Sequence, residues 1–123
     1  MIIEAAEIER RARELEENIQ IIDNQLSELD SFIYNINSVI NSKNDEFLAS
    51  LGKRVYMDTK IKDKKRLFIE VGAGVVLKKK PEEVVEIAKE QKENLKEVRM
   101  EILSKLNEYH EKLHEFIHIV KED

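Results

Sequence analysis

The chain has 123 residues, of which 38% are charged, and it carries a formal net charge of −5 with no cysteine. The lack of cysteine excludes a disulfide framework and a thiolate zinc site, and no apolar run approaches the roughly 18 residues that a membrane-spanning helix needs. The N-terminus has neither the basic start nor the apolar core of a signal peptide, so we expect a single-domain cytoplasmic protein.

Residues 4–42 are expected to form one long helix with a narrow apolar stripe. The steps between its apolar residues alternate between three and four without exception. This heptad pattern is typical of a coiled coil, in which a second helix must cover the stripe. The N-terminal stripe consists of Ala5, Ile8, Ala12, Leu15, Ile19, Ile22, Leu26, Leu29, Ile33, Ile36 and Ile40.

The central segment, residues 46–80, is expected to form two β-hairpins. All three glycines lie in it, and the only proline, Pro81, follows it. Gly72 and Gly74 supply the positive φ of a tight reversal. The four predicted strands cover residues 46–51, 55–62, 67–71 and 75–77. Four short strands cannot cover their own faces and edges, so we expect them to oligomerise with another copy or a relative. The candidate oligomerisation residues are Val55, Met57, Ile61, Leu67, Ile69, Val71, Gly72, Gly74, Val75 and Leu77.

The same segment is strongly basic. Residues 53–80 hold ten Lys/Arg and three acids, a balance of +7, whereas the rest of the chain has a balance of −12. The simplest interpretation is solubility together with repulsion between strand edges. Nucleic-acid binding is an alternative, although only Tyr56 and Phe68 are available there for base stacking. The cations of that alternative are Lys53, Arg54, Lys60, Lys62, Lys64, Lys65 and Arg66.

Residues 81–123 are expected to form the second helix. Pro81 suits its first position, and Glu82 and Glu83 complement the helix dipole. The central segment between the two predicted helices reverses the direction of the chain, so we expect the helices to pack antiparallel. A stutter at Ile102 interrupts the heptads. The C-terminal stripe consists of Val84, Ala88, Gln91, Leu95, Val98, Ile102, Leu106, Tyr109, Leu113, Phe116 and Val120.

The two termini meet at one end of such a helix pair, and both are more apolar than the packing of two helices requires. One interpretation is a hydrophobic plug that closes the helix ends, and the other is an exposed contact site for apolar clients. The candidate contact residues are Ile2, Ile3, Ile8, Phe116, Ile117, Ile119 and Val120.

No catalytic or cofactor motif is legible in the chain. Gly72-Ala73-Gly74 lacks the further glycine and the following helix of a phosphate loop. His110, His114 and His118 recur every four residues, but they lie outside the stripe and have no buried carboxylate partner. We therefore expect solvated histidines, no metal, no cofactor and no enzymatic activity.

The order helix, two hairpins, helix resembles prefoldin, and specifically its alpha-type subunit. Two positions differ from the usual pattern: Arg54 replaces a common glycine, and the first strand, Phe47 to Ser50, is a weaker apolar run without the usual proline. The resemblance is carried by Leu51-Gly52, Val55-Tyr56-Met57, Lys60-Ile61-Lys62-Asp63, the run from Leu67 to Val76, and Glu82-Glu83.

The resemblance implies a mostly α fold with a small β part. One domain, 1–123, would consist of a coiled-coil helix (1–45), two β-hairpins that join a β-barrel (46–80) and a second coiled-coil helix (81–123). It implies an ATP-independent chaperone subunit, assembled as two alpha-type and four beta-type subunits, which holds unfolded proteins at its tips and passes them to a group II chaperonin. A homo-oligomer and a structural coiled-coil adaptor are the alternatives.

Overall fold

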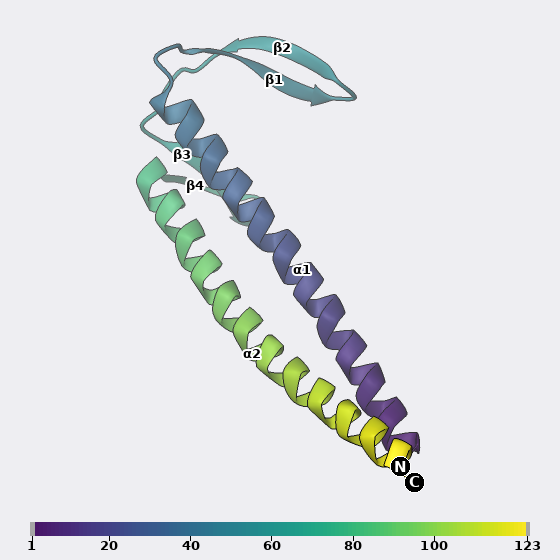
Figure 1. Ribbon diagram of the computed structural model, residues 1–123. Helices are drawn as coiled ribbons and strands as arrows, with labels where there is room; N and C mark the ends of the chain where they lie inside the picture. Colours follow the sequence, from purple (N-terminus) through teal and green to yellow (C-terminus); the bar gives the residue numbers. More distant parts are fainter. Residues whose placement is uncertain (1, 123) are drawn as a thin grey trace. The chain divides into compact units, whose positions relative to one another are not determined.

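The computed structural model describes the backbone of residues 2–122 and the side chains of residues 4–119. Two long helices flank two β-hairpins, which confirms the predicted fold (Figure 1). The elements are α1 (Ile2–Asn41), β1 (Glu46–Gly52), β2 (Val55–Lys60), β3 (Leu67–Gly72), β4 (Val75–Lys79) and α2 (Pro81–Glu122). The chain divides into two compact units, an arm unit of Met1–Leu29 and Glu90–Asp123 and a hub unit of Asp30–Lys89.

The core of each unit lies between α1 and α2. In the arm unit the buried aliphatic side chains are Ala12, Ile22 and Leu106, and in the hub unit they are Ile36, Val84 and Ala88. All six occupy predicted stripe positions. Antiparallel packing of the arm unit follows from two contacts between the helices, which join Glu16 to His110 and Asp23 to Arg99.

The C-terminal stripe departs from the prediction in the arm unit. Val98 is 44% exposed and Gln91 is also exposed, whereas Leu103 is half-buried. Two four-residue steps follow Val98, at Ile102 and Leu106. At about 100° per residue, these steps turn Val98 roughly 80° away from the direction of Leu106. The same rotation brings Arg99 to within about 20° of that direction, so a cation stands where the heptad pattern predicts a valine.

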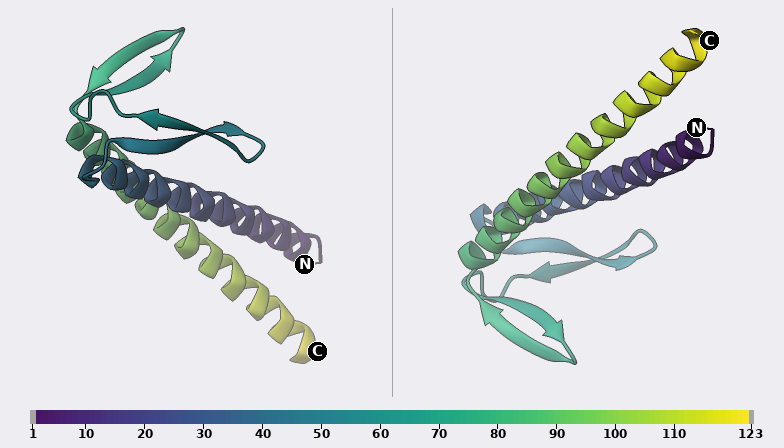
Figure 2. Two further views of the ribbon diagram at one scale, coloured as in Figure 1. Left: turned by 90° about the horizontal axis from the view of Figure 1, so that it is seen from above. Right: turned by 90° about the horizontal axis from the view of Figure 1, so that it is seen from below.

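The strands form two separate antiparallel hairpins, β1–β2 and β3–β4 (Figures 1 and 2). Each closes through a two-residue turn, Lys53-Arg54 in the first and Ala73-Gly74 in the second. All four turn residues have positive φ, from 49° to 76°. This is the backbone of a type I′ turn, whose twist matches that of the strands and which favours Asn-Gly. Lys53, Arg54 and Ala73 are therefore held in a conformation that L-residues with a Cβ seldom adopt.

The end of α1 is tied to the connection between the hairpins by Lys64. Its ammonium donates to the carbonyl oxygen of Ser42 at 2.6 Å and lies 3.2 Å from a carboxylate oxygen of Asp45. The last turn of α1 contains no basic residue, so Lys64 supplies the positive charge that the C-terminal end of a helix favours. The backbone N–H of Ile61 donates to the carbonyl of Asp45 at 2.7 Å and fixes the same junction.

Candidate functional site

The first candidate surface lies in the arm unit, at the start of α1 and the end of α2. Ile8 and Phe116 are half-buried and line one groove, in agreement with the predicted antiparallel pairing. The remaining groove residues are all charged: Glu4, Glu7, Arg11, Lys112 and Glu115. The groove thus has an apolar part and a charged rim, which is the anatomy of many protein contact sites.

The end of α2 also exposes two isoleucines. Ile117 is 54% exposed and Ile119 is 43% exposed, and both lie outside the stripe that packs against α1. The side chains of Ile2, Ile3 and Val120, the other predicted contact residues, lie outside the described residues. Ile8, Phe116, Ile117 and Ile119 therefore form the described part of the candidate contact surface, and their role in binding stays a prediction.

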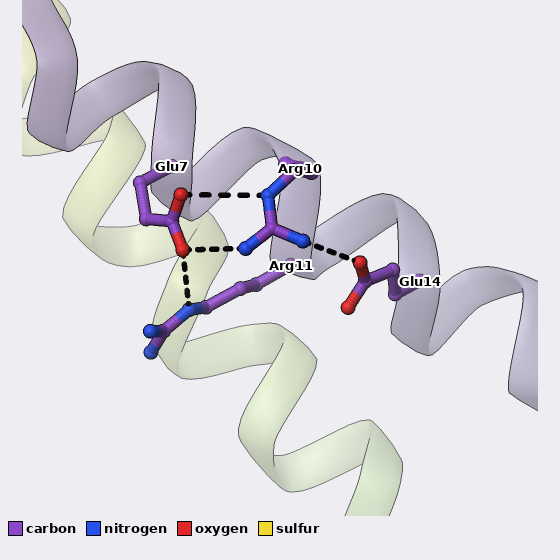
Figure 3. Close-up of polar contacts among 4 residues, drawn as sticks. All are labelled: Glu7, Arg10, Arg11 and Glu14. Carbon is purple, nitrogen blue, oxygen red and sulfur yellow. Dashed lines mark hydrogen bonds and ion pairs between the residues drawn. The ribbon is translucent and has the colours of Figure 1, made fainter.

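A network of charged side chains stiffens the rim of this groove (Figure 3). The Arg10 guanidinium donates to Glu7 at 2.6 Å through Nη2 and to Glu14 at 2.6 Å through Nη1, while Arg11 Nε donates to Glu7 Oε1 at 3.1 Å. Hydrogen bonds from Arg10 and then Arg11 lower the pKa of the Glu7 carboxyl. The pKa of Arg11 is raised, first by a hydrogen bond with Tyr109 and then by Glu7.

The second candidate surface is the apolar face that each hairpin presents in the hub unit. In the β1–β2 hairpin, register pairs Phe47 with Thr59 and Ala49 with Met57, which places these side chains on one face together with Val55. Leu51 lies at a register shift beside the turn. In the β3–β4 hairpin, Ile69 opposite Leu77 marks the corresponding face. Phe47, Leu51, Val55, Met57, Val71, Val75 and Leu77 are large, apolar and exposed. We call these two surfaces the apolar hairpin faces.

The predicted oligomerisation residues fall mainly on these faces. Val55, Met57, Val71, Val75 and Leu77 are exposed, while Ile61, Leu67 and Ile69 are half-buried. Gly72 and Gly74 instead shape the second turn, with φ of 117° and 76°. Their part in oligomerisation stays a prediction.

The prediction omitted Phe47 and Ala49 of β1, although they share a face with the residues it included. The period-two pattern of residues 47–51 and a two-residue turn would not have found them, because without a bulge they pair Ala49 with Asp58. The register shift between Ser50 and Gly52 is what places Ala49 opposite Met57. A strand read alone shows which residues share a side. Only its partner shows which side is apolar across the whole hairpin.

The opposite face of each hairpin is mixed. It carries Leu48 and Tyr56 beside Asp58 in the first hairpin, and Phe68 beside Glu70 in the second. The Lys78 ammonium lies 5.5 Å from the centroid of the Phe68 ring, a cation–π contact across the strands. Polar groups interrupt this opposite face. The apolar hairpin faces are therefore the surfaces whose apolar side chains a binding partner would remove from water.

The described residues contain neither a cluster of metal ligands nor a membrane-spanning helix. Among residues 4–119, no group of three or more His, Cys, Asp or Glu side chains is placed to hold a metal ion. His110 Nε2 lies 3.5 Å from Glu16 Oε1, on the exposed side of the arm unit. Over their described residues, neither α1 nor α2 is both long enough and apolar enough to cross a membrane.

Comparisons with known proteins agree on one family. The family model described as "Prefoldin subunit" matches residues 8–122. A curated relative, prefoldin subunit alpha of Thermofilum pendens, is 29% identical over 99 residues, which cover 78% of this chain and 75% of that protein. A cryo-EM structure of filamentous PFD from Methanocaldococcus jannaschii has a TM-score of 0.79 at 16% identity and is similar over 94% of this chain and 97% of its own. At that identity the structural match shows the shared fold.

Proposed function

This chain belongs to the prefoldin family, and from that premise we propose that it is an alpha-type chaperone subunit. Prefoldins are non-enzymatic chaperones, so the proposed activity needs no ATP hydrolysis by this chain. The subunit binds unfolded proteins at the ends of its helices, prevents their aggregation and passes them to a group II chaperonin in the cytoplasm. The family match carries the proposal, and the exposed Ile117 and Ile119 support the location of the binding surface.

The proposed assembly uses the hub. Both apolar hairpin faces are exposed, and a two-stranded hairpin is at best marginally stable alone in water. Pairing with hairpins of other prefoldin subunits would cover the faces and extend the strands into a β-barrel. We propose a hexamer of two alpha-type and four beta-type subunits, in which the 123 residues act as one domain, with a homo-oligomer as the alternative.

The contact surface suits a chaperone that must release its client. Burial of one apolar side chain stabilises a complex by roughly 1.5–3 kcal/mol before the entropic cost of ordering the client is subtracted. The helix ends of one subunit, which we call a tip, therefore bind a client weakly. Several tips on one assembly raise the effective concentration and hence the overall affinity. Weak individual contacts then let the client leave in steps.

The proposed contact surface can be tested with a matched pair of substitutions. Ile117 and Ile21 are the same residue type, are each 54% exposed and both lie in the arm unit. Ile117→Ser should weaken the suppression of aggregation of a chemically denatured client, measured by light scattering, whereas Ile21→Ser should leave it unchanged. Equal effects of the two substitutions would contradict the assignment.

A larger deletion tests the function as a whole. Removal of residues 1–8 and 116–123 should abolish suppression of aggregation and leave the number of subunits in the assembly unchanged. A chaperone should protect several unrelated denatured proteins, whereas a structural adaptor should protect none. Full protection by the truncated assembly would overturn the location of the surface, and lack of protection by the intact assembly would overturn the function.

A further inference from the structure

The groove of the arm unit carries unpaired charge beside its apolar part. Ile8 and Phe116 form that part, which we call the apolar floor, and the groove has a volume of about 600 Å³. This volume lies in the range of sites that hold a drug-sized molecule. The groove is therefore large enough for a short segment of an unfolded chain, with a large side chain packed against the floor.

The five charged residues of the rim divide into a neutral pair and an acidic remainder. Arg11 Nε lies 3.1 Å from Glu7 Oε1, so these two charges largely cancel (Figure 3). No ion pair joins Glu4, Lys112 or Glu115 to another described side chain, and all three are exposed. The charge that the rim offers to a ligand is therefore two acids against one cation.

Both unpaired acids lie close to the apolar floor. Glu4 precedes Ile8 by about one turn of α1, and side chains four residues apart on a helix are neighbours, with Cβ atoms about 5–6 Å apart. Glu115 is adjacent to Phe116 on α2 and lines the same groove. Because the Debye length is about 8 Å at physiological salt, a cation held beside the floor is attracted by both carboxylates.

The net charge of the whole arm unit has the same sign. The unit contains nine Lys or Arg and seventeen Asp or Glu, a balance of −8, whereas the hub unit has a balance of +3. The summed field of such a unit attracts cationic chains and repels anionic ones before contact. Charge complementarity of this kind speeds encounter and distinguishes between ligands that bury the same apolar area.

We propose that the groove selects unfolded segments in which a large apolar residue is flanked by lysine or arginine. The apolar side chain packs against Ile8 and Phe116, and the flanking cations lie beside Glu4 and Glu115. Lys112 repels the same cations and limits the preference. The inference rests on the proposed function, because it takes the groove to be a client site, and it adds the chemical class of the client.

Two peptides that differ only in the charge of their flanks serve as probes. Each is short and unstructured, with a central phenylalanine, and the flanks are lysines in one peptide and glutamates in the other. Binding to the intact assembly is measured by fluorescence anisotropy at about 0.05 M and about 0.5 M salt. At low salt the lysine-flanked peptide should bind roughly fivefold more tightly, a modest ratio because exposed ion pairs are weak. At high salt the ratio should fall toward one, because salt screens the attraction.

A third peptide separates the apolar contact from the charge. It keeps the lysine flanks and carries serine in place of the central phenylalanine. This peptide should bind at least about tenfold more weakly than its phenylalanine counterpart, because it has no side chain to pack against the apolar floor. Equal binding of these two lysine-flanked peptides would overturn the inference, since the groove would then take no part in the contact.

Substitutions of opposite charge on the rim should move the lysine-to-glutamate ratio in opposite directions. Glu4→Gln combined with Glu115→Gln should lower the ratio by about threefold, whereas Lys112→Gln should raise it. The matched control combines Glu17→Gln with Glu101→Gln, which removes one exposed acid from each helix of the same unit outside the groove. This control should leave the ratio nearly unchanged. Far-UV circular dichroism first establishes that each variant is helical, and if the Glu4 and Glu115 variant loses helix, Lys112→Gln tests the same prediction with the opposite sign.

Equal binding of the two charged peptides at low salt would overturn the inference, as would no detectable binding of either. An equal fall in the ratio for the groove variant and the control variant would also overturn it, because the preference would then come from the net charge of the arm unit. Suppression of client aggregation without any charge preference would count against this inference alone. Charge-selective peptide binding without suppression of aggregation would instead contradict the proposed function and leave the selectivity of the groove standing.

Discussion

Arg99 of α2 makes a two-point contact with Asp23 of α1, with Nε 2.7 Å from Oδ1 and Nη2 3.4 Å from Oδ2. Asp23 raises the pKa of the Arg99 guanidinium, chiefly through the hydrogen bond. The stutter at Ile102 turns Arg99 toward the helix pair and turns Val98 out. This pair marks the register at which the two helices of the arm unit meet.

Arg99→Lys should lower the melting temperature of the arm helices, because lysine cannot reproduce the forked contact. Asp23→Asn should have a similar effect, and the double variant should be no worse than either single one. The effects should be small, since both side chains are more than a third exposed. Thermal unfolding followed by circular dichroism at 222 nm measures them.

Leu106→Ala is the reference for that series. Leu106 is only 7% exposed, so this change should cost about 2–5 kcal/mol through lost packing and exceed the effect of Arg99→Lys. Simple additivity of Asp23→Asn and Arg99→Lys would show that the two residues do not act together.

The first hairpin should become more stable when Arg54 is replaced by glycine. Arg54 has φ of 66° and Lys53 has φ of 49°, and each such residue with a Cβ costs roughly 1–2 kcal/mol in the left-handed region. Arg54→Gly should recover about 1 kcal/mol of that, although glycine makes the unfolded chain more flexible. Hydrogen exchange of the β1–β2 amides would report the gain as slower exchange.

Ala73→Gly, at φ of 50° in the second hairpin, is the matched control and should slow exchange in β3–β4 only. If Arg54→Gly sped up exchange in the first hairpin, the Arg54 side chain would have to contribute more stability through its contacts than its backbone conformation costs.

The sequence predicted most of the fold because the signals were local and strong. The alternation of three and four from Ala5 to Ile40 predicted α1, and Pro81 marked the first residue of α2. The stutter at Ile102 was visible in the sequence, but the Asp23–Arg99 contact was not predicted, because it depends on how the two four-residue steps turn Arg99 toward α1 in the packed helix pair. Lys64 was taken as one more surface cation, and its contact with Ser42 joins residues 22 positions apart. The apolar hairpin faces were found only in part, since the register across the turn was needed to add β1.

Gly72 and Gly74 test how far the second hairpin supports assembly. Their φ values are 117° and 76°, and a Cβ at either position would meet no atom within 4 Å. Replacement of both by valine should therefore cost backbone strain alone, roughly 1–2 kcal/mol or more at each position. We expect a dissociated protein with intact helices and no suppression of aggregation. Native mass spectrometry and circular dichroism separate loss of assembly from loss of helix, and a native-size assembly would count against the role of this turn.

The Glu7 network predicts a specific loss of stability in acid. Arg10 and Arg11 hold the pKa of Glu7 below its ordinary value of 4.5, so the folded state favours the ionised carboxylate. The stabilising contribution is therefore fully present above about pH 4.5 and is lost as the pH falls through the folded pKa.

Glu7→Gln should flatten the dependence of melting temperature on pH between about pH 6 and about pH 3. Glu17→Gln, at an exposed residue that makes no ion pair among the described side chains, should leave the dependence as it is. The carboxyl carbon of Glu7, followed by NMR through the same range, gives the pKa directly. A value at or above 4.5 would show that the arginine contacts do not persist in solution and that the charged rim of the groove is not held by this network.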